Sequence, residues 1–191
     1  MQTRVDPRSV SVRDLSEADI PFVLDYWFRS PPGFIESLGA DPAKLPPEAQ
    51  FGDSLRQRVR TNAGLGGSRL TSLAILHEEQ FVGFHNLNPL VEGDFGVFHA
   101  HISRPEFRRR GVAECSYPQA CRVFLQRFDL KRILFKTPAR NVGAIRVKEK
   151  LGIRFIGEEL VDFGIIRPGT LAKVYELTRE EAARAERHDV S

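Results

Sequence analysis

A basic loop in the middle of the chain holds the residues with the clearest chemistry. The segment Arg104-Pro-Glu-Phe-Arg-Arg-Arg-Gly-Val-Ala113 follows an apolar run at 97–102, and a helical pattern begins at Val112. A helix that starts here leaves backbone N–H groups unpaired, and its dipole favours negative charge at this end. Gly111 has no Cβ to keep a ligand away from the backbone. The loop is therefore predicted to bind a phosphorylated ligand.

This loop follows neither of the two common phosphate-binding patterns. The sequence contains no Gly-x-x-x-x-Gly-Lys-Ser/Thr motif and no Gly-x-Gly-x-x-Gly motif. Its own pattern is Arg108-x-x-Gly111-x-Ala113, which resembles the acetyl-CoA pyrophosphate loop of the GNAT superfamily of N-acetyltransferases.

A second stretch strengthens the resemblance. Asn141-Val-Gly-Ala144, followed by Leu151-Gly-Ile153, is similar to another signature of the same family and lies at the expected distance after the loop. The resemblance covers about residues 70–178. Within the family, the sequence most resembles the branch of the ribosomal-protein N-terminal acetyltransferases.

The resemblance implies an enzyme that moves an acetyl group from acetyl-CoA to a primary amine, either a peptide N-terminus or a small amine. It implies an α+β fold, with one domain built on a mostly antiparallel mixed central sheet flanked by helices. Acetyl-CoA is the expected cosubstrate, and no metal is expected. The residues expected to bind it lie at the end of a strand, in the loop and at two helix starts: Ile102, Ser103, Arg104, Arg108, Arg109, Arg110, Gly111, Val112, Ala113 and Asn141.

The resemblance implies that this single domain (residues 1–191) consists of acceptor-side helices at 1–67 and a CoA-binding core at 68–178, followed by a charged tail at 179–191. Pro118 is expected to kink the helix after the loop or to delay its start past Tyr117. The remaining expected elements are strands at 10–15, 70–76, 81–87, 94–102, 132–137, 153–162 and 170–177, helices at 20–28, 47–61, 141–151 and 180–187, and a flexible connection at 64–67.

Two histidines are the candidates for a catalytic base. Strand alternation places Val97, His99, His101 and Ser103 on one face of the strand before the loop. An imidazole has an ordinary pKa of about 6.5 and suits the removal of a proton from an amine. Either histidine is the base, or both only shape the pocket. By resemblance, the glutamate base of many family members falls on Val97, which takes no proton.

The sequence also leaves more than one candidate for the residue that donates a proton to the leaving thiolate. By resemblance, many family members have a tyrosine at the position of Lys148, and the ribosomal-protein branch commonly has a serine at that of Ala144. The basic residues on this helix are expected to be mostly solvated. Tyr117 and Tyr175 are either substitutes or core residues. Catalysis could otherwise rest on proximity alone, or the chain could be a catalytically silent CoA-binding sensor or interaction module.

Charge is unevenly distributed along the chain. Residues 104–154 contain 14 Lys/Arg and 4 Asp/Glu, whereas the rest of the chain contains 14 basic and 21 acidic residues. The basic block suits a polyanionic small ligand such as CoA. Nucleic acid is the second possibility, but aromatic residues do not alternate with these arginines as a stacking surface requires, so no nucleic-acid partner is expected. The acidic remainder favours a cationic acceptor, and the aromatic cluster at 26–34 is either a pocket wall or a helix core.

Length and composition bound the remaining possibilities. A chain of 191 residues with 41% hydrophobic content is expected to form one domain, as a monomer or homodimer. No apolar run is long enough for a membrane span and no secretory signal is visible, so a cytoplasmic protein without a membrane partner is expected. Cys115 and Cys121 suggest neither a disulfide framework nor a metal cluster.

Overall fold

A mixed sheet of seven strands forms the centre of the molecule. The computed structural model describes residues 3–64, 69–162 and 164–189. Strand order is β1-β2-β3-β4-β5-β7-β6, and every neighbouring pair is antiparallel except β4 and β5. The predicted α+β class with a mostly antiparallel sheet is thus confirmed. The strands are β1 (Val10–Asp14), β2 (Ser72–His77), β3 (Gln80–Val91), β4 (Phe95–Ile102), β5 (Arg132–Pro138), β6 (Arg154–Val161) and β7 (Thr170–Thr178).

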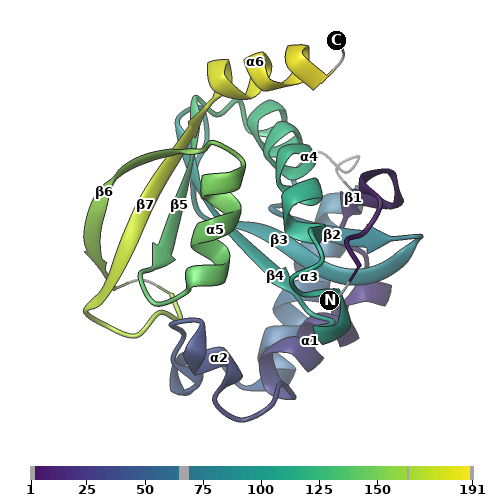
Figure 1. The fold of residues 1–191 in the computed structure, drawn as a ribbon. Coiled ribbons are helices and arrows are strands. Elements are labelled where there is room, and N and C mark those ends of the chain that lie inside the picture. The colour runs from purple at the N-terminus through teal and green to yellow at the C-terminus, as the bar shows by residue number, and fades with distance from the viewer. Residues whose placement is uncertain (1–2, 65–68, 163, 190–191) are drawn as a thin grey trace.

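Helices cover both faces of this sheet (Figure 1). Helices α4 and α5 lie on one face, and α1 and α3 lie on the other. Among the described residues, no helix is apolar over the length that a bilayer crossing requires. The helices are α1 (Ile20–Phe28), α2 (Phe34–Ser37), α3 (Glu48–Gly64), α4 (Val112–Arg127), α5 (Val142–Lys150) and α6 (Arg179–Asp189).

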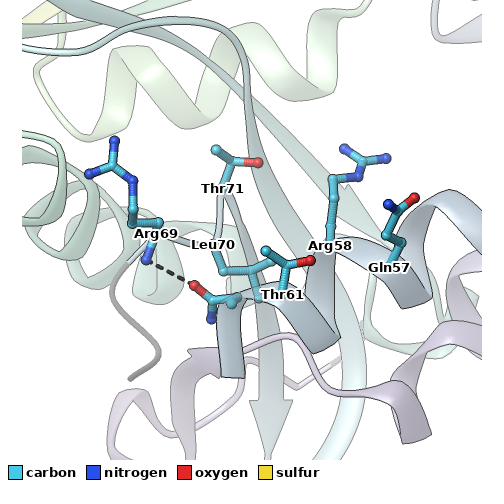
Figure 2. Close-up of a pocket in the computed structure, with 7 residues that line it drawn as sticks. Gln57, Arg58, Thr61, Arg69, Leu70 and Thr71 are labelled. Atoms are coloured by element: carbon cyan, nitrogen blue, oxygen red, sulfur yellow. Dashed lines mark hydrogen bonds between the residues drawn. The ribbon is translucent and has the colours of Figure 1, made fainter. Parts of the chain in front are cut away.

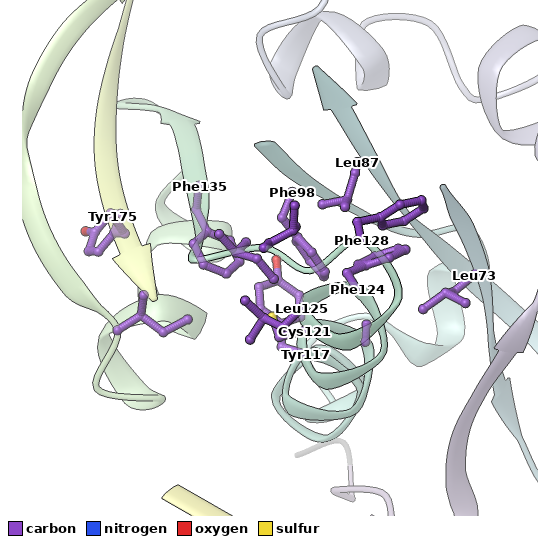
Figure 3. Close-up of a cluster of buried hydrophobic side chains, with 14 of the residues drawn as sticks. Leu73, Leu87, Phe98, Tyr117, Cys121, Phe124, Leu125, Phe128, Phe135 and Tyr175 are labelled. Carbon is purple, nitrogen blue, oxygen red and sulfur yellow. The ribbon is translucent and has the colours of Figure 1, made fainter. Parts of the chain in front are cut away.

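Side chains that alternate along the strands pack into two hydrophobic cores, one on each face of the sheet. On the α4 face, Phe98 of β4 packs with Phe124 of α4 (Figure 3). On the opposite face, Ala74 and Phe84 of β2 and β3 pack with residues of α1 and α3. The alternation predicted for β4 is therefore confirmed, because His101 contacts Phe84 on this second face.

The sheet divides between its two parallel strands. β4 and β5 pair only over three residues each, and the last pair is Val97 with Leu134. Beyond it, β4 stays paired with β3 while β5 stays paired with β7. The first residues past this point, Phe98 and Phe135, have ring centroids 5.2 Å apart. We call this place the fork; α4 and α5 each start at its open end, where ligands of parallel strands usually bind.

Pro118 does not delay the start of the helix after the loop. Helix α4 begins at Val112, as its sequence pattern predicts, and it continues through Pro118 to Arg127. The ring of a proline costs a helix interior about 3 kcal/mol, but four later residues of α4 are buried in the core and hold the helix in place: Ala120, Cys121, Phe124 and Leu125. The connection predicted at 64–67 lies outside the described residues except for Gly64, which ends α3.

Candidate active site

The loop between β4 and α4 has the backbone shape that its sequence predicts. Pro105–Phe107 forms one short 3-10 turn, and Arg109 and Gly111 both have positive φ, +60° and +89°. Gly111 caps α4, and a Cβ built on it would lie 3.1 Å from Nη2 of Arg4. A side chain at this position would therefore be strained by its φ and would fill the space above the loop.

Several polar groups of this loop have no protein partner within the part of the chain that the structure describes. The first helical N–H to donate is that of Cys115, to the carbonyl of Gly111 at 3.1 Å, while the N–H groups of residues 109–114 have no such acceptor. The hydroxyl of Ser103 is buried without a partner. Donors at a helix start, together with a buried free hydroxyl, fit an anionic group such as a pyrophosphate.

The four arginines of the loop have different surroundings. Arg108 donates to the carbonyls of Ile102 and Ser103 at 3.0 and 3.2 Å, and its guanidinium lies 3.9 Å from the centroid of Phe34. Arg108 thus ties the end of β4 to α2, and its predicted contact with phosphate remains a prediction. Arg104 lies 3.8 Å from the carboxylate of Glu106, Arg110 donates to the carbonyl of Thr3 at 2.9 Å, and Arg109 is exposed.

Arg4 is a functional candidate that the sequence does not reveal. The N-terminal segment crosses the loop, where the N–H of Val5 donates to the carbonyl of Arg110 at 3.0 Å. Arg4 forms an ion pair with Glu114, whose other oxygen accepts from Lys150 at 2.8 Å. Burial alone would raise the pKa of Glu114, but the hydrogen bonds from Lys150 and Arg4 lower it. One carboxylate thus holds two cations beside the start of α4.

Asn141 marks the second helix start near the fork. Its side-chain oxygen accepts from the N–H of Ala144 at 3.2 Å, so its predicted role as the N-cap of α5 is confirmed. A contact with CoA remains a prediction for this residue. Val112 and Ala113 form the first turn of α4, and Ile102 ends β4, so the loop residues predicted to bind the donor share one end of the fork.

His99 is held by a backbone carbonyl. Its Nε2 lies 2.6 Å from the carbonyl oxygen of Asn88 in β3. A carbonyl only accepts, so Nε2 carries the hydrogen and Nδ1 is the basic nitrogen. Burial lowers the pKa of His99, the bond to Asn88 opposes this, and the charge of Lys148 lowers it further. The ring is therefore neutral at physiological pH.

His101 sits in an aromatic cluster against α1. Its Nδ1 lies 3.1 Å from the hydroxyl of Tyr26, and its ring is stacked on Phe84 and edge-on to Trp27. Burial raises the pKa of Tyr26, so this hydroxyl keeps its proton and shares a hydrogen bond with Nδ1. Burial and the neighbouring histidines hold the pKa of His101 well below its ordinary value. The ring is therefore neutral and engaged by Tyr26 at Nδ1.

The opposite side of the fork holds a second buried polar group. Lys148 of α5 is buried, whereas Arg146 and Lys150 are exposed, in line with the expectation that the basic residues of this helix are mostly solvated. Its Nζ lies 3.5 Å from the hydroxyl of Tyr117. Figure 3 shows Tyr117 beside Phe98 and Phe135, whereas Tyr175 stands apart on β7. Of the two tyrosines predicted as proton donors, only Tyr117 lies at the fork.

A surface hollow elsewhere on the molecule has none of these features. It lies between α3 and the segment before β2, where the N–H of Arg69 donates to Asn62 at 2.9 Å (Figure 2). Its lining consists of Gln57, Arg58, Thr61, Asn62, Arg69, Leu70 and Thr71. No predicted site residue lines it, and it offers no carboxylate, histidine or thiol for acyl transfer. Within the described part of the chain, no three His, Cys, Asp or Glu residues are placed to hold a metal ion.

Solved structures of several acetyltransferases are similar to this fold. Ribosomal-protein-S5-alanine acetyltransferase from Vibrio fischeri matches at 15% identity with a TM-score of 0.69, covering 91% of this chain and 94% of that one. Spermidine N-acetyltransferase from Vibrio cholerae, in complex with CoA and spermine, matches at 14% identity with a TM-score of 0.70, covering 92% of this chain and 99% of that one. An aminoglycoside acetyltransferase in complex with coenzyme A matches at 15% identity with a TM-score of 0.68, covering 93% of this chain and 99% of that one. At 14–15% sequence identity, these similarities show that the chain shares the fold of these proteins.

The family itself is shown by the sequence. A search of curated proteins found no match to the chain. The family model described as the acetyltransferase (GNAT) domain matches residues 10–154, a span that includes the loop, the fork and both helix starts. Because this match covers well over half of the 191 residues, the chain belongs to the GNAT acetyltransferases.

Proposed function

We propose that this acetyltransferase moves the acetyl group of acetyl-CoA to a primary amine, either a peptide N-terminus or a small amine. The observation that carries the proposal is the loop at the open end of the fork, where a helix start offers unpaired N–H groups among arginines. Acetyl-CoA supplies an activated acetyl group as a thioester, and a neutral amine is the nucleophile that such a thioester acylates.

The donor would be held by the start of α4. The N–H groups of residues 109–114 would surround the pyrophosphate, and Arg104, Arg109 and Arg110 would neutralise its charge. Arg4 lies directly above Gly111 and adds a fifth arginine to the four of the loop. The excess of basic residues between 104 and 154 suits a ligand with several phosphates.

His99 suits the role of base better than His101. Its Nε2 donates to the carbonyl of Asn88, so Nδ1 has the lone pair that can accept a proton from the attacking amine. In His101 the hydroxyl of Tyr26 engages Nδ1, and burial and the neighbouring histidines hold the pKa of the ring well below its ordinary value. We assign His101 to shaping the acceptor side, where it packs with Trp27 and Phe84.

Two observations support an amine as the acceptor. The solved structures described above are of enzymes named for the acetylation of ribosomal-protein alanine, spermidine and aminoglycosides, all of which offer amines. Outside residues 104–154, acidic residues outnumber basic ones by 21 to 14, which favours the approach of a cation. Helices α1 and α3, on the face of β4 that holds His101, would form the acceptor side.

Heating with ligands tests the donor, and turnover with amines tests the acceptor. A ligand that binds only the native state at a hundredfold excess over its Kd adds about 2.7 kcal/mol of stability. We expect acetyl-CoA to raise the Tm and NAD or ATP to raise it far less. Release of CoA thiol should then depend on an added amine from a panel of peptides, polyamines and aminoglycosides.

The two assays also separate the alternatives. No shift at millimolar acetyl-CoA would refute the proposal. Binding of acetyl-CoA without turnover of any amine would instead indicate a catalytically silent CoA-binding module. Retention on heparin that CoA does not reduce would indicate nucleic-acid binding.

A further inference from the structure

Lys148 is the one lysine or arginine that is buried among the described residues, with 4% of its surface exposed. Its Nζ lies 5.5 and 5.9 Å from the ring centroids of Tyr117 and Phe135, and within the described ranges its one hydrogen-bond partner is the Tyr117 hydroxyl at 3.5 Å. No described carboxylate pairs with it. A buried ammonium without a counter-ion is costly, so this position favours a ligand that brings negative charge.

The ammonium lies where the two parallel strands separate. Phe98 and Phe135 are the first residues beyond the last β4–β5 pair, and the ring of Tyr117 is 4.9 Å from that of Phe98 (Figure 3). Lys148 is therefore part of the wall of the fork on the α4 and α5 side. His99 lies on the other face of β4, and the charge of Lys148 still lowers its pKa.

We propose that Lys148 is a catalytic residue that stabilises and protonates the sulfur leaving group of the acyl transfer. This inference rests on the proposed function. The amine lone pair forms the C–N bond, the C–S bond breaks, and its electron pair stays on sulfur. Lys148 gives one proton to that sulfur, the surplus proton of the amine nitrogen goes to His99, and water restores both side chains to their starting states.

The groups around Lys148 leave it as the one that titrates near neutrality. Burial lowers the pKa of Lys148 to about 7, an effect that the thiol of Cys121 opposes. From α4, Tyr117 and Cys121 face it, and burial raises the pKa of both, so they stay protonated. From β3 and β4, His85 and His99 have lowered pKa values and stay neutral. A group poised near 7 can both give a proton and regain it.

Lys148→Met tests the inference, with Lys131→Met as the matched control at an exposed site away from the fork. Calorimetry compares the binding of CoA with that of desulfo-CoA, which lacks the sulfur. The parent and the control should prefer CoA by roughly tenfold or more above neutral pH, and Lys148→Met should lose this preference. Removing an unpaired buried charge does not threaten folding.

Spectroscopy and kinetics extend the same comparison. In the parent, the ultraviolet absorbance of bound CoA thiolate should develop at lower pH than in Lys148→Met. The kcat of Lys148→Met should fall roughly 10²–10⁴-fold, and the decline of the rate above pH 7 should disappear. The acetyl-CoA Kd should change far less.

Three results would overturn the inference. One is a Lys148→Met enzyme with the thiolate titration, sulfur preference and kcat of Lys131→Met. Another is an acetyl group found by mass spectrometry on Lys148 itself during turnover, because the side chain would then be a nucleophile. In both cases the parent still binds and turns over acetyl-CoA, so the proposed function stands. The third result is a parent that does not bind acetyl-CoA, which would overturn the proposed function together with this inference.

Discussion

The loop before α4 and the groups at the fork both use basic side chains, but these side chains differ in their protonation. The loop arginines are at least partly open to water, and their guanidinium groups stay charged at any physiological pH. His99, His101 and Lys148 have pKa values lowered by burial. Permanent charge suits the holding of phosphates, whereas groups close to neutrality suit the movement of protons. Under the proposed function, phosphate binding is thus assigned to the loop, and proton transfer to groups on β4 and α5.

Gly111→Val should have the largest effect, and it acts on the loop alone. The branched side chain is strained at a φ of +89° and fills the space beside Arg4, so CoA binding should be abolished. Isothermal titration of CoA measures the loss, and circular dichroism checks that the protein remains folded. Gly93→Val is the matched control, because Gly93 has a φ of +75° and open space around it, in the distant β3–β4 turn. CoA affinity equal to that of the control would exclude the loop from the site.

His99→Ala should have the next largest effect, and it acts at the fork alone. Without the basic Nδ1, kcat should fall roughly 10²–10⁴-fold while CoA affinity stays nearly unchanged. The acidic limb of the pH–rate profile, which lies below the ordinary pKa of 6.5, should disappear. His101→Ala should keep the profile of the parent and raise mainly the acceptor KM. If the two variants behaved the other way round, His101 would be the base despite its hydrogen bond with Tyr26.

The same contrast explains what could be predicted from the sequence. The loop and the Asn141 cap depend on residues within a few positions, and strand alternation is also local, so these features were predictable. The contact of His101 with Tyr26 joins residues 75 positions apart, and Lys148 is buried only because α4 and β5 close around it. The position of Arg4 above the loop likewise depends on how the N-terminal segment crosses the sheet. Such contacts depend on packing between distant elements, which periodicity does not reveal.

The smallest expected effect is on stability, and it separates the buried lysine from the solvated arginines. In the folded chain the pKa of Lys148 is lowered to about 7, whereas its ordinary value is 10.5. Between these values the unfolded chain binds more protons than the folded chain, so stability rises with pH across this window. From pH 7 to pH 9 the parent should therefore gain about 2 kcal/mol in free energy of unfolding relative to Lys148→Met.

Urea unfolding at the two pH values measures this gain. The comparison with Lys148→Met removes the opposing effect of Cys121 and other groups that both proteins share. Replacing the loop residue Arg109 by Met should leave the pH dependence of the parent unchanged, because a guanidinium stays protonated in both states throughout this range. Equal slopes for the parent and Lys148→Met would mean that the ammonium is solvated and charged in the folded protein. The fork would then differ from the loop in position and not in charge state, and the separation of binding from proton transfer would rest on His99 alone.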